Sequence, residues 1–155
     1  MTYKIFGLPT HILVIHLVVL GIPLACLATA AIALRPLWRT GKTGFVVLVL
    51  NALAFGGTYI ARLSGIELYN HQKFLRQDPA VQHHKALGLT LIWYILGLLL
   101  ATVLLVLAEK YERPPLTTVF AFIALAAAVA AMVQTVRVGD AGARATWGPI
   151  IKNSP

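Results

Sequence analysis

Residues 10–34 read THILVIHLVVLGIPLACLATAAIAL, a run of 25 positions without a charged side chain. A transmembrane helix needs about 20 mainly apolar residues, because the hydrocarbon core is about 30 Å thick and a helix rises about 1.5 Å per residue. This stretch is therefore long enough to cross a bilayer. Three more apolar stretches follow at residues 44–61, 85–108 and 116–136, and charged residues or prolines bound each of them.

The composition of the chain agrees with a membrane protein. Of its 155 residues, 59% are hydrophobic and 12% are charged, which is too apolar for a soluble domain of this size. We predict an all-α fold: one domain over residues 1–155, an integral membrane four-helix bundle with up-down-up-down order and both termini on the same side. The net charge of +8 would suggest nucleic acid in a soluble protein. Here we assign the basic side chains to lipid headgroups and expect no nucleic-acid partner.

The distribution of basic residues predicts a direction of insertion. Five of the thirteen lie in the two short connections between helices: Arg35, Arg39, Lys42, Lys110 and Arg113. The other face carries the remaining eight, spread over a much longer total of chain. Basic residues in short loops beside the helices have the largest effect on orientation and favour the cytoplasmic side. We therefore expect a multi-pass protein of the cell (plasma) membrane with both termini outside the cytoplasm.

All five histidines fall on the face that carries the termini. His11 and His16 lie in the first predicted helix, His71 in the long loop, and His83 and His84 at the start of the third helix. His16 is the most informative, because ionisable groups at membrane depth are costly and usually face the bundle interior or water. Its depth is about 9 Å below the helix start. A neutral histidine hydrogen-bonded to another helix stays open as the structural alternative.

Two kinds of cofactor fit such a cluster. A haem b needs two imidazoles at similar height on facing helices, and we name His16 and His84 as the leading ligands, with His11 as a third candidate. His16 lies up to about 9 Å deeper than His84, whereas His11 matches His84 in height but is expected at the wet rim. A transition-metal site would instead draw on His11, His16, His84 and Asp140. As supporting partners we expect Arg144, His83, His71 and Trp147.

These motifs resemble a family of small bacterial membrane proteins known as domain of unknown function twenty-two thirty-one. The family pattern has two histidines five apart in the first helix, His-x-x-Leu-Gly at the start of the third, and a glycine-containing ending after the fourth. The matching residues are His11 and His16, residues 84–88 (HKALG) and residues 139–142 (GDAG). The chain departs from the pattern at two positions: Ile12 replaces a common proline, and Asp140 replaces a histidine.

The resemblance implies a redox or respiratory setting, because such domains are sometimes joined to, or encoded near, Rieske-type iron–sulfur proteins. Our first hypothesis is an electron-transfer membrane protein whose histidine-rich face binds haem b or a metal. The second is an accessory subunit of a larger respiratory or other membrane complex, in which the histidines only satisfy one another. A quinone or lipid-headgroup pocket is a further alternative. No arrangement typical of a catalytic nucleophile is present, so we expect a protein that is not an enzyme.

Overall fold

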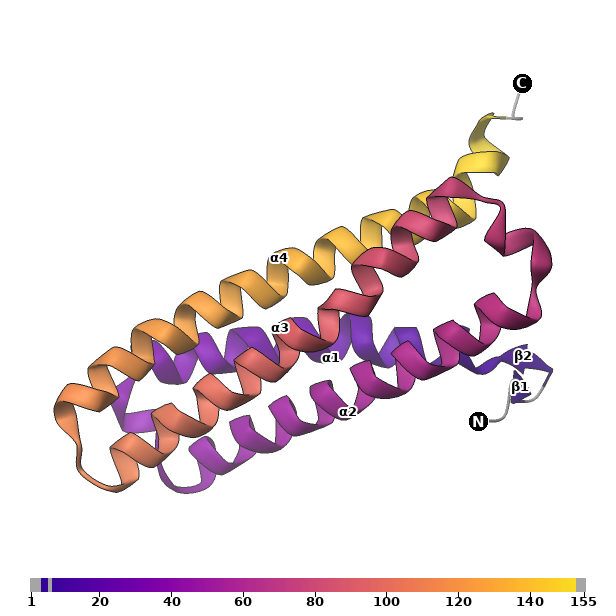
Figure 1. Ribbon diagram of the computed structural model, residues 1–155. Helices are drawn as coiled ribbons and strands as arrows, with labels where there is room; N and C mark the ends of the chain where they lie inside the picture. The colour runs from indigo at the N-terminus through magenta and orange to yellow at the C-terminus, as the bar shows by residue number, and fades with distance from the viewer. Residues whose placement is uncertain (1–3, 6, 153–155) are drawn as a thin grey trace.

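The computed structural model describes residues 4–5 and 7–152 and consists of four long helices (Figure 1). In chain order they are α1 (Thr10–Leu34), α2 (Gly41–His71), α3 (Pro79–Lys110) and α4 (Pro114–Lys152). Two single turns of 3₁₀ helix connect them, η1 (Pro36–Trp38) and η2 (Lys73–Arg76). Before α1, the two-residue strands β1 (Lys4–Ile5) and β2 (Leu8–Pro9) pair antiparallel. The predicted all-α fold is confirmed.

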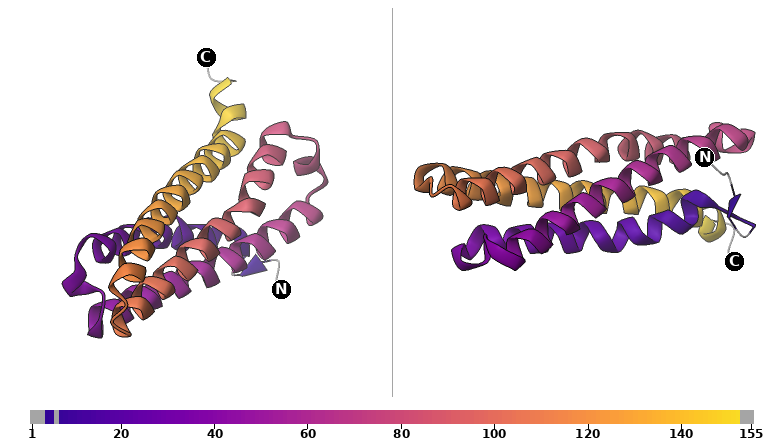
Figure 2. Two further views of the ribbon diagram at one scale, coloured as in Figure 1. Left: turned by 60° about the vertical axis from the view of Figure 1, so that its left-hand side comes forward. Right: turned by 90° about the horizontal axis from the view of Figure 1, so that it is seen from below.

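The helices form a bundle in which each neighbours the next along the chain. α1 packs against α2 and α4, and α3 packs against α2 and α4, so α1 and α3 occupy one diagonal. Successive helices run in opposite directions, which brings the N-terminus, the C-terminus and η2 to one end (Figures 1 and 2). The two short connections lie at the other end. The predicted up-down-up-down order with both termini on one side is therefore present.

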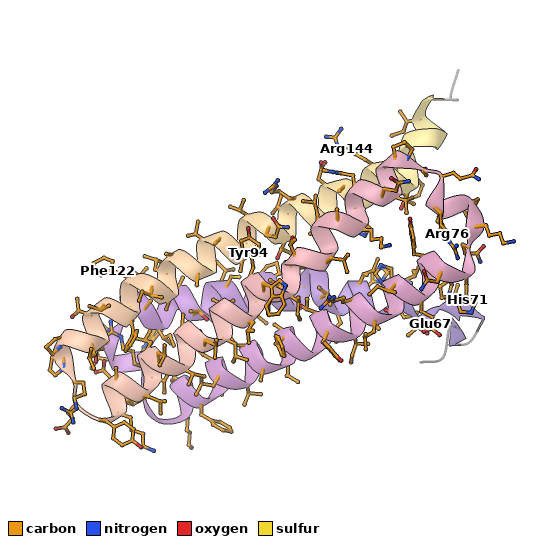
Figure 3. The ribbon with its side chains drawn as sticks, viewed as in Figure 1. Glu67, His71, Arg76, Tyr94, Phe122 and Arg144 are labelled. Carbon is orange, nitrogen blue, oxygen red and sulfur yellow. The ribbon has the colours of Figure 1, made fainter. Side chains whose placement is uncertain are left out.

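All four helices are long and apolar enough to cross a membrane. Their outward surfaces carry large hydrophobic side chains, and Leu20 and Phe122 are 75% and 70% exposed. Figure 3 shows Phe122 pointing away from the bundle. Exposed apolar area on this scale is costly in water and favourable in lipid. The protein is thus a multi-pass membrane protein.

The first predicted helix has the bounds expected from the sequence, but the other three are longer than predicted. α2 continues to His71 and α3 begins at Pro79, so most of the expected loop over residues 62–84 is helical. α3 starts where Asp78 caps it, with the carboxylate accepting a hydrogen bond of 2.8 Å from the backbone N–H of Ala80. α4 continues through residues 139–147, beyond the predicted end of the fourth helix at residue 136. An apolar window detects the part of a helix that lies in hydrocarbon, whereas backbone hydrogen bonding continues beyond it.

The bundle is built from two similar hairpins, α1–α2 and α3–α4. Thr29 and Thr102 lie 73 positions apart, and their hydroxyls are 3.2 Å from one another across the diagonal. The same offset relates buried positions of α1 to buried positions of α3: Val18 to Leu91, Ile22 to Ile95, Ala25 to Leu98 and Ile32 to Leu105. Two halves of parallel direction that meet in this way are related by an approximate twofold axis along the bundle.

The second helix of each hairpin follows the same rule with an offset of 77 positions. Thr58 and Thr135 are both buried, and each hydroxyl donates a 2.7 Å hydrogen bond to the carbonyl four residues earlier. Ala54 and Ala131, which supply those carbonyls, are also equivalent and buried. The correspondence therefore extends to individual hydrogen bonds.

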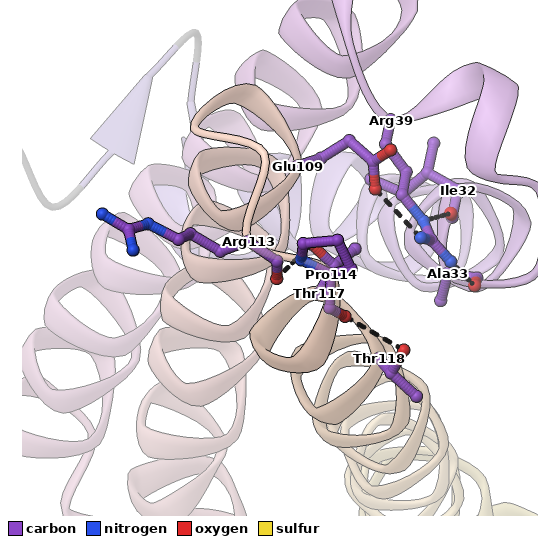
Figure 4. Close-up of polar contacts among 8 residues, drawn as sticks. All are labelled: Ile32, Ala33, Arg39, Glu109, Arg113, Pro114, Thr117 and Thr118. Carbon is purple, nitrogen blue, oxygen red and sulfur yellow. Dashed lines mark hydrogen bonds and ion pairs between the residues drawn. The ribbon is translucent and has the colours of Figure 1, made fainter.

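A buried arginine closes the end of the bundle opposite the termini (Figure 4). The guanidinium of Arg39 donates hydrogen bonds to the carbonyls of Ile32 and Ala33, at 3.0 and 2.8 Å, and pairs with Glu109 at 3.0 Å. The last carbonyls of a helix have no partner within it. Arg39 satisfies two of them in α1 and ties α1 to α3.

We predict that Arg39→Met destabilises the folded bundle by about 2–4 kcal/mol, because two carbonyls and one carboxylate lose their donor together. The measurement is unfolding of the purified protein by increasing SDS in mixed micelles, followed by circular dichroism. The exposed Arg113, changed to Met, serves as the matched control. Equal stability of the two variants would contradict this role for Arg39.

Candidate functional site

His11 lies in the first turn of α1 and is held by α2. Its Nδ1 is 3.0 Å from the carbonyl oxygen of Ala61, fifty positions along the chain. A carbonyl oxygen only accepts hydrogen bonds, so Nδ1 carries the proton and Nε2 keeps its lone pair. The buried Ser64 donates to the same carbonyl at 3.1 Å. The contact fixes both the orientation and the tautomer of the ring.

His84 stands in the same relation to α4. Its Nδ1 is 3.0 Å from the carbonyl oxygen of Val138, so Nδ1 is again the donor and Nε2 again has a free lone pair. His84 is offset from His11 by 73 positions and Val138 from Ala61 by 77, which are the offsets of the two hairpins. The twofold relation of the bundle thus includes these histidines and their acceptors.

A glycine lies against each imidazole. A Cβ atom on Gly65 would stand 3.0 Å from Cε1 of His11, and one on Gly142 would stand 3.0 Å from Cε1 of His84. Both separations are shorter than an ordinary contact between carbon atoms. Each ring therefore packs against the glycine backbone, and a Cβ at either position would require the ring to shift.

The two imidazoles face each other between the diagonal helices. Their ring centroids are 6.5 Å apart with the planes crossed at 65°. Neither Nε2 atom has a hydrogen-bond partner among the residues the structure describes. Both rings are partly buried, and they meet in an edge-type, T-shaped arrangement.

The pair lies deeper in the bundle than predicted. α2 continues ten residues past Ala61, or about 15 Å, and α4 continues fourteen residues past Val138, or about 21 Å. The expectation that His11 would stand at the wet rim assumed a shorter α2 and α4. The longer helices surround it.

Other residues named from the sequence do not join this pair. His16 is exposed on the outside of α1, where its Nδ1 bonds to the carbonyl of Ile12 at 2.7 Å. His71 bonds to the carbonyl of Glu67 at 2.9 Å, at the exposed end of α2 (Figure 3). His83 and Trp147 are exposed. Of the predicted histidines, the structure brings together His11 and His84.

Asp140 and Arg144 form an ion pair with each other. They are one turn apart on α4, with Arg144 Nε 2.8 Å from Asp140 Oδ2, and both side chains are more than half exposed. Neither side chain therefore folds back over the histidines as a supporting partner. Within residues 4–5 and 7–152, no three His, Cys, Asp or Glu side chains gather as a metal site would require.

A cleft of about 340 Å³ opens between α2 and α3 at the histidine end. Its lining residues are Tyr69, Gln82, Lys85, Ala86 and Leu89. The Lys85 ammonium lies 3.7 Å from the ring centroid of Tyr69, a cation–π contact between the two helices. Arg62 of α2 directly follows Ala61. Its Nε atom is buried and has no hydrogen-bond partner in the described chain. Lys85 is the cation among the residues that line the cleft.

Sequence reasoning missed the glycines and carbonyls that hold the imidazoles. A backbone carbonyl carries no residue-specific signal, and Gly65 lies in a segment that we predicted to be a loop. The offset of 73 positions between His11 and His84, together with the 77 between Gly65 and Gly142, was the signal that would have found them. A search for internal repeats reveals this kind of pairing.

The model of one protein family, described as predicted membrane protein (DUF2231), matches residues 7–155 of the chain. This match confirms the resemblance that the histidine and glycine motifs indicated. No curated protein and no solved structure matches the chain.

We predict that Gly142→Ala destabilises the bundle by about 1–3 kcal/mol, because the new methyl group overlaps the His84 ring. Gly97→Ala in α3 is the control, since a Cβ there meets nothing within 4 Å and alanine favours a helix by up to about 1 kcal/mol. Unfolding in SDS-containing mixed micelles measures both. A stabilised Gly142→Ala variant would show that the ring does not depend on this glycine.

Proposed function

We propose that this chain, which belongs to the DUF2231 family of predicted membrane proteins, binds one haem b and transfers single electrons in the membrane. His11 and His84 are the two axial ligands, one from each hairpin. The observation that carries the proposal is the 6.5 Å separation of two imidazole rings whose Nε2 lone pairs are free. When bound, haem supplies one-electron redox chemistry.

The spacing of the rings fits two ligands on opposite sides of one metal ion. With metal–nitrogen bonds of about 2.0 Å and an imidazole radius of about 1.1 Å, two such centroids would lie about 6.2 Å apart. The observed separation is 6.5 Å. The centroid separation therefore agrees with that of two histidines bound to one metal ion.

The number of ligands favours haem over a free metal ion. A protein metal site ordinarily takes three or four donor groups from the chain, and the described residues gather only two histidines here. A haem brings four nitrogen donors of its own and needs just two axial ligands. A single metal ion held by two imidazoles is the second candidate, and the same ring geometry supports it.

The surroundings of the rings suit a histidine ligand. A ligating imidazole usually donates its other N–H to a carbonyl or carboxylate, which orients the ring and raises its basicity. Ala61 and Val138 supply those carbonyls. If His11 and His84 held a haem together, they would leave no open position on it for a substrate, which favours electron transfer as the proposed role.

The proposed setting is the plasma membrane, with the histidine pair towards the extracytoplasmic face. The basic residues of the two short connections at the opposite end support this direction. A Rieske-type protein or a larger respiratory complex is the proposed electron partner, on the basis of the family resemblance. The alternative role, an accessory subunit with structural histidines, gives the same fold without a bound cofactor.

We predict that the protein purified in mild detergent shows a sharp haem α-band in a dithionite-reduced minus oxidised spectrum. His11→Leu and His84→Leu each remove one ligand and abolish this band. His16→Leu is the matched control, because His16 faces outward, and it keeps the cofactor content of the wild type.

A flat spectrum from the wild-type protein would contradict haem binding. Elemental analysis of the same sample then separates the remaining alternatives. One equivalent of a transition metal in the wild-type protein, lost in His84→Leu, would support the metal site. If the wild-type protein contains no metal, the accessory-subunit interpretation is favoured.

A further inference from the structure

We infer that the α2–α3 side of the histidine pair binds the two carboxylates of the haem, through Arg62 and Lys85, and that the α1–α4 side receives its hydrocarbon edge. This inference rests on the proposed function and deepens it. It assigns an anion-binding role to two residues and a single orientation to the cofactor.

The argument starts from the twofold relation between the hairpins. A haem between His11 and His84 has one edge towards the α2–α3 side and the other towards the α1–α4 side, and the axis exchanges these sides. If the symmetry were perfect, the two orientations of the haem would be equally stable. The side chains that break the symmetry therefore decide between them.

Among the positions at which the hairpins differ in charge, two directly follow His84 and Ala61, the acceptor of His11. Arg62 of α2 corresponds to Gly139 of α4, by the offset of 77, and Lys85 of α3 corresponds to Ile12 of α1, by the offset of 73. The α2–α3 side thus has two cations at positions where the α1–α4 side has a glycine and an isoleucine.

The environment of the two cations suits an anionic ligand. Arg62 follows Ala61, the acceptor of His11, and its buried Nε has no hydrogen-bond partner among the described residues. A buried donor without a partner is destabilising, and a carboxylate would supply the missing acceptor. Lys85 follows His84 and lines the 340 Å³ cleft, where its ammonium rests on Tyr69 rather than on an acid.

Charged groups elsewhere at this end do not offer an equal site. Arg137 and Arg144 of α4 are exposed, and they already bond to Gln134 at 3.4 Å and Asp140 at 2.8 Å. Glu67 of α2 lies about 140° around the helix from Arg62. Asp78 caps α3 through its bond to Ala80.

The chemistry of haem b matches this division. Its two propionate carboxylates leave from one edge, and the opposite edge carries only vinyl and methyl groups. Hydrogen bonds between ionised partners are about twice as strong as neutral ones, and arginine suits a carboxylate through its fork of donors. The edge with the carboxylates would therefore meet two cations, and the opposite edge would meet the uncharged Ile12 and Gly139.

The test compares haemin with its dimethyl ester, in which both carboxylates are neutral. Each ligand is titrated into the full-length apoprotein in detergent, and binding is followed by the absorbance of the low-spin complex. We expect wild-type protein to prefer haemin by at least tenfold, the effect of one charge-assisted hydrogen bond. In Arg62→Gln/Lys85→Gln the preference falls to within about twofold, while Arg137→Gln/Arg144→Gln, which removes the same charge, keeps it.

The outcomes separate this inference from the proposed function. If neither ligand forms a low-spin complex with wild-type protein, the proposed function fails, and this inference fails with it. If both bind equally, or if the control variant loses the preference, haem binding stands and the assignment of Arg62 and Lys85 is overturned. If the double variant does not fold, the single variant Lys85→Gln is used instead. The inference requires this variant to lose part of the preference for haemin over its dimethyl ester.

Discussion

Hydrocarbon offers no hydrogen bonds, so every polar group in the membrane-spanning part of this protein must find a partner within the bundle. The threonines of α2, α3 and α4 meet this constraint by bonding to carbonyls one turn earlier. At one end of the bundle, Arg39 donates hydrogen bonds to two carbonyls of α1 and to the carboxylate of Glu109. At the other end, His11 and His84 each form one such hydrogen bond, from Nδ1 to a backbone carbonyl. In both rings Nδ1 has a carbonyl partner, whereas Nε2 has no hydrogen-bond partner in the described chain.

The twofold repetition of the hairpins explains why the site has two equal halves. Each hairpin supplies an imidazole from its first helix, and a carbonyl and a glycine from its second. Packing the hairpins across the diagonal brings the imidazoles to the axis, just as it brings Thr29 to Thr102 further along the bundle. A site on an axis suits a ligand with two similar faces. A planar macrocycle is such a ligand, and residues that differ between the hairpins are then free to distinguish its edges.

The sequence predicted the four spans and their order because hydrophobic length is a local property. The bounds of α1 were correct for that reason, whereas the polar ends of α2, α3 and α4 were missed because helical hydrogen bonding continues where hydropathy falls. The choice between His11 and His16 depended on which face of α1 turns inward and on how far its neighbours extend. Depth alone favoured His16, and packing places His11 opposite His84. The partners Ala61 and Val138 act through their backbone, which no residue pattern reveals.

The central claim is that two imidazoles, one from each hairpin, bind the same iron. Electron paramagnetic resonance of the oxidised, haem-loaded wild-type protein tests it most directly, because the ligand field of ferric haem reports both axial partners. The account predicts a low-spin ferric signal typical of two histidine ligands, and its loss in either single histidine variant. A high-spin signal, or a low-spin signal that survives replacement of His84, would contradict the account.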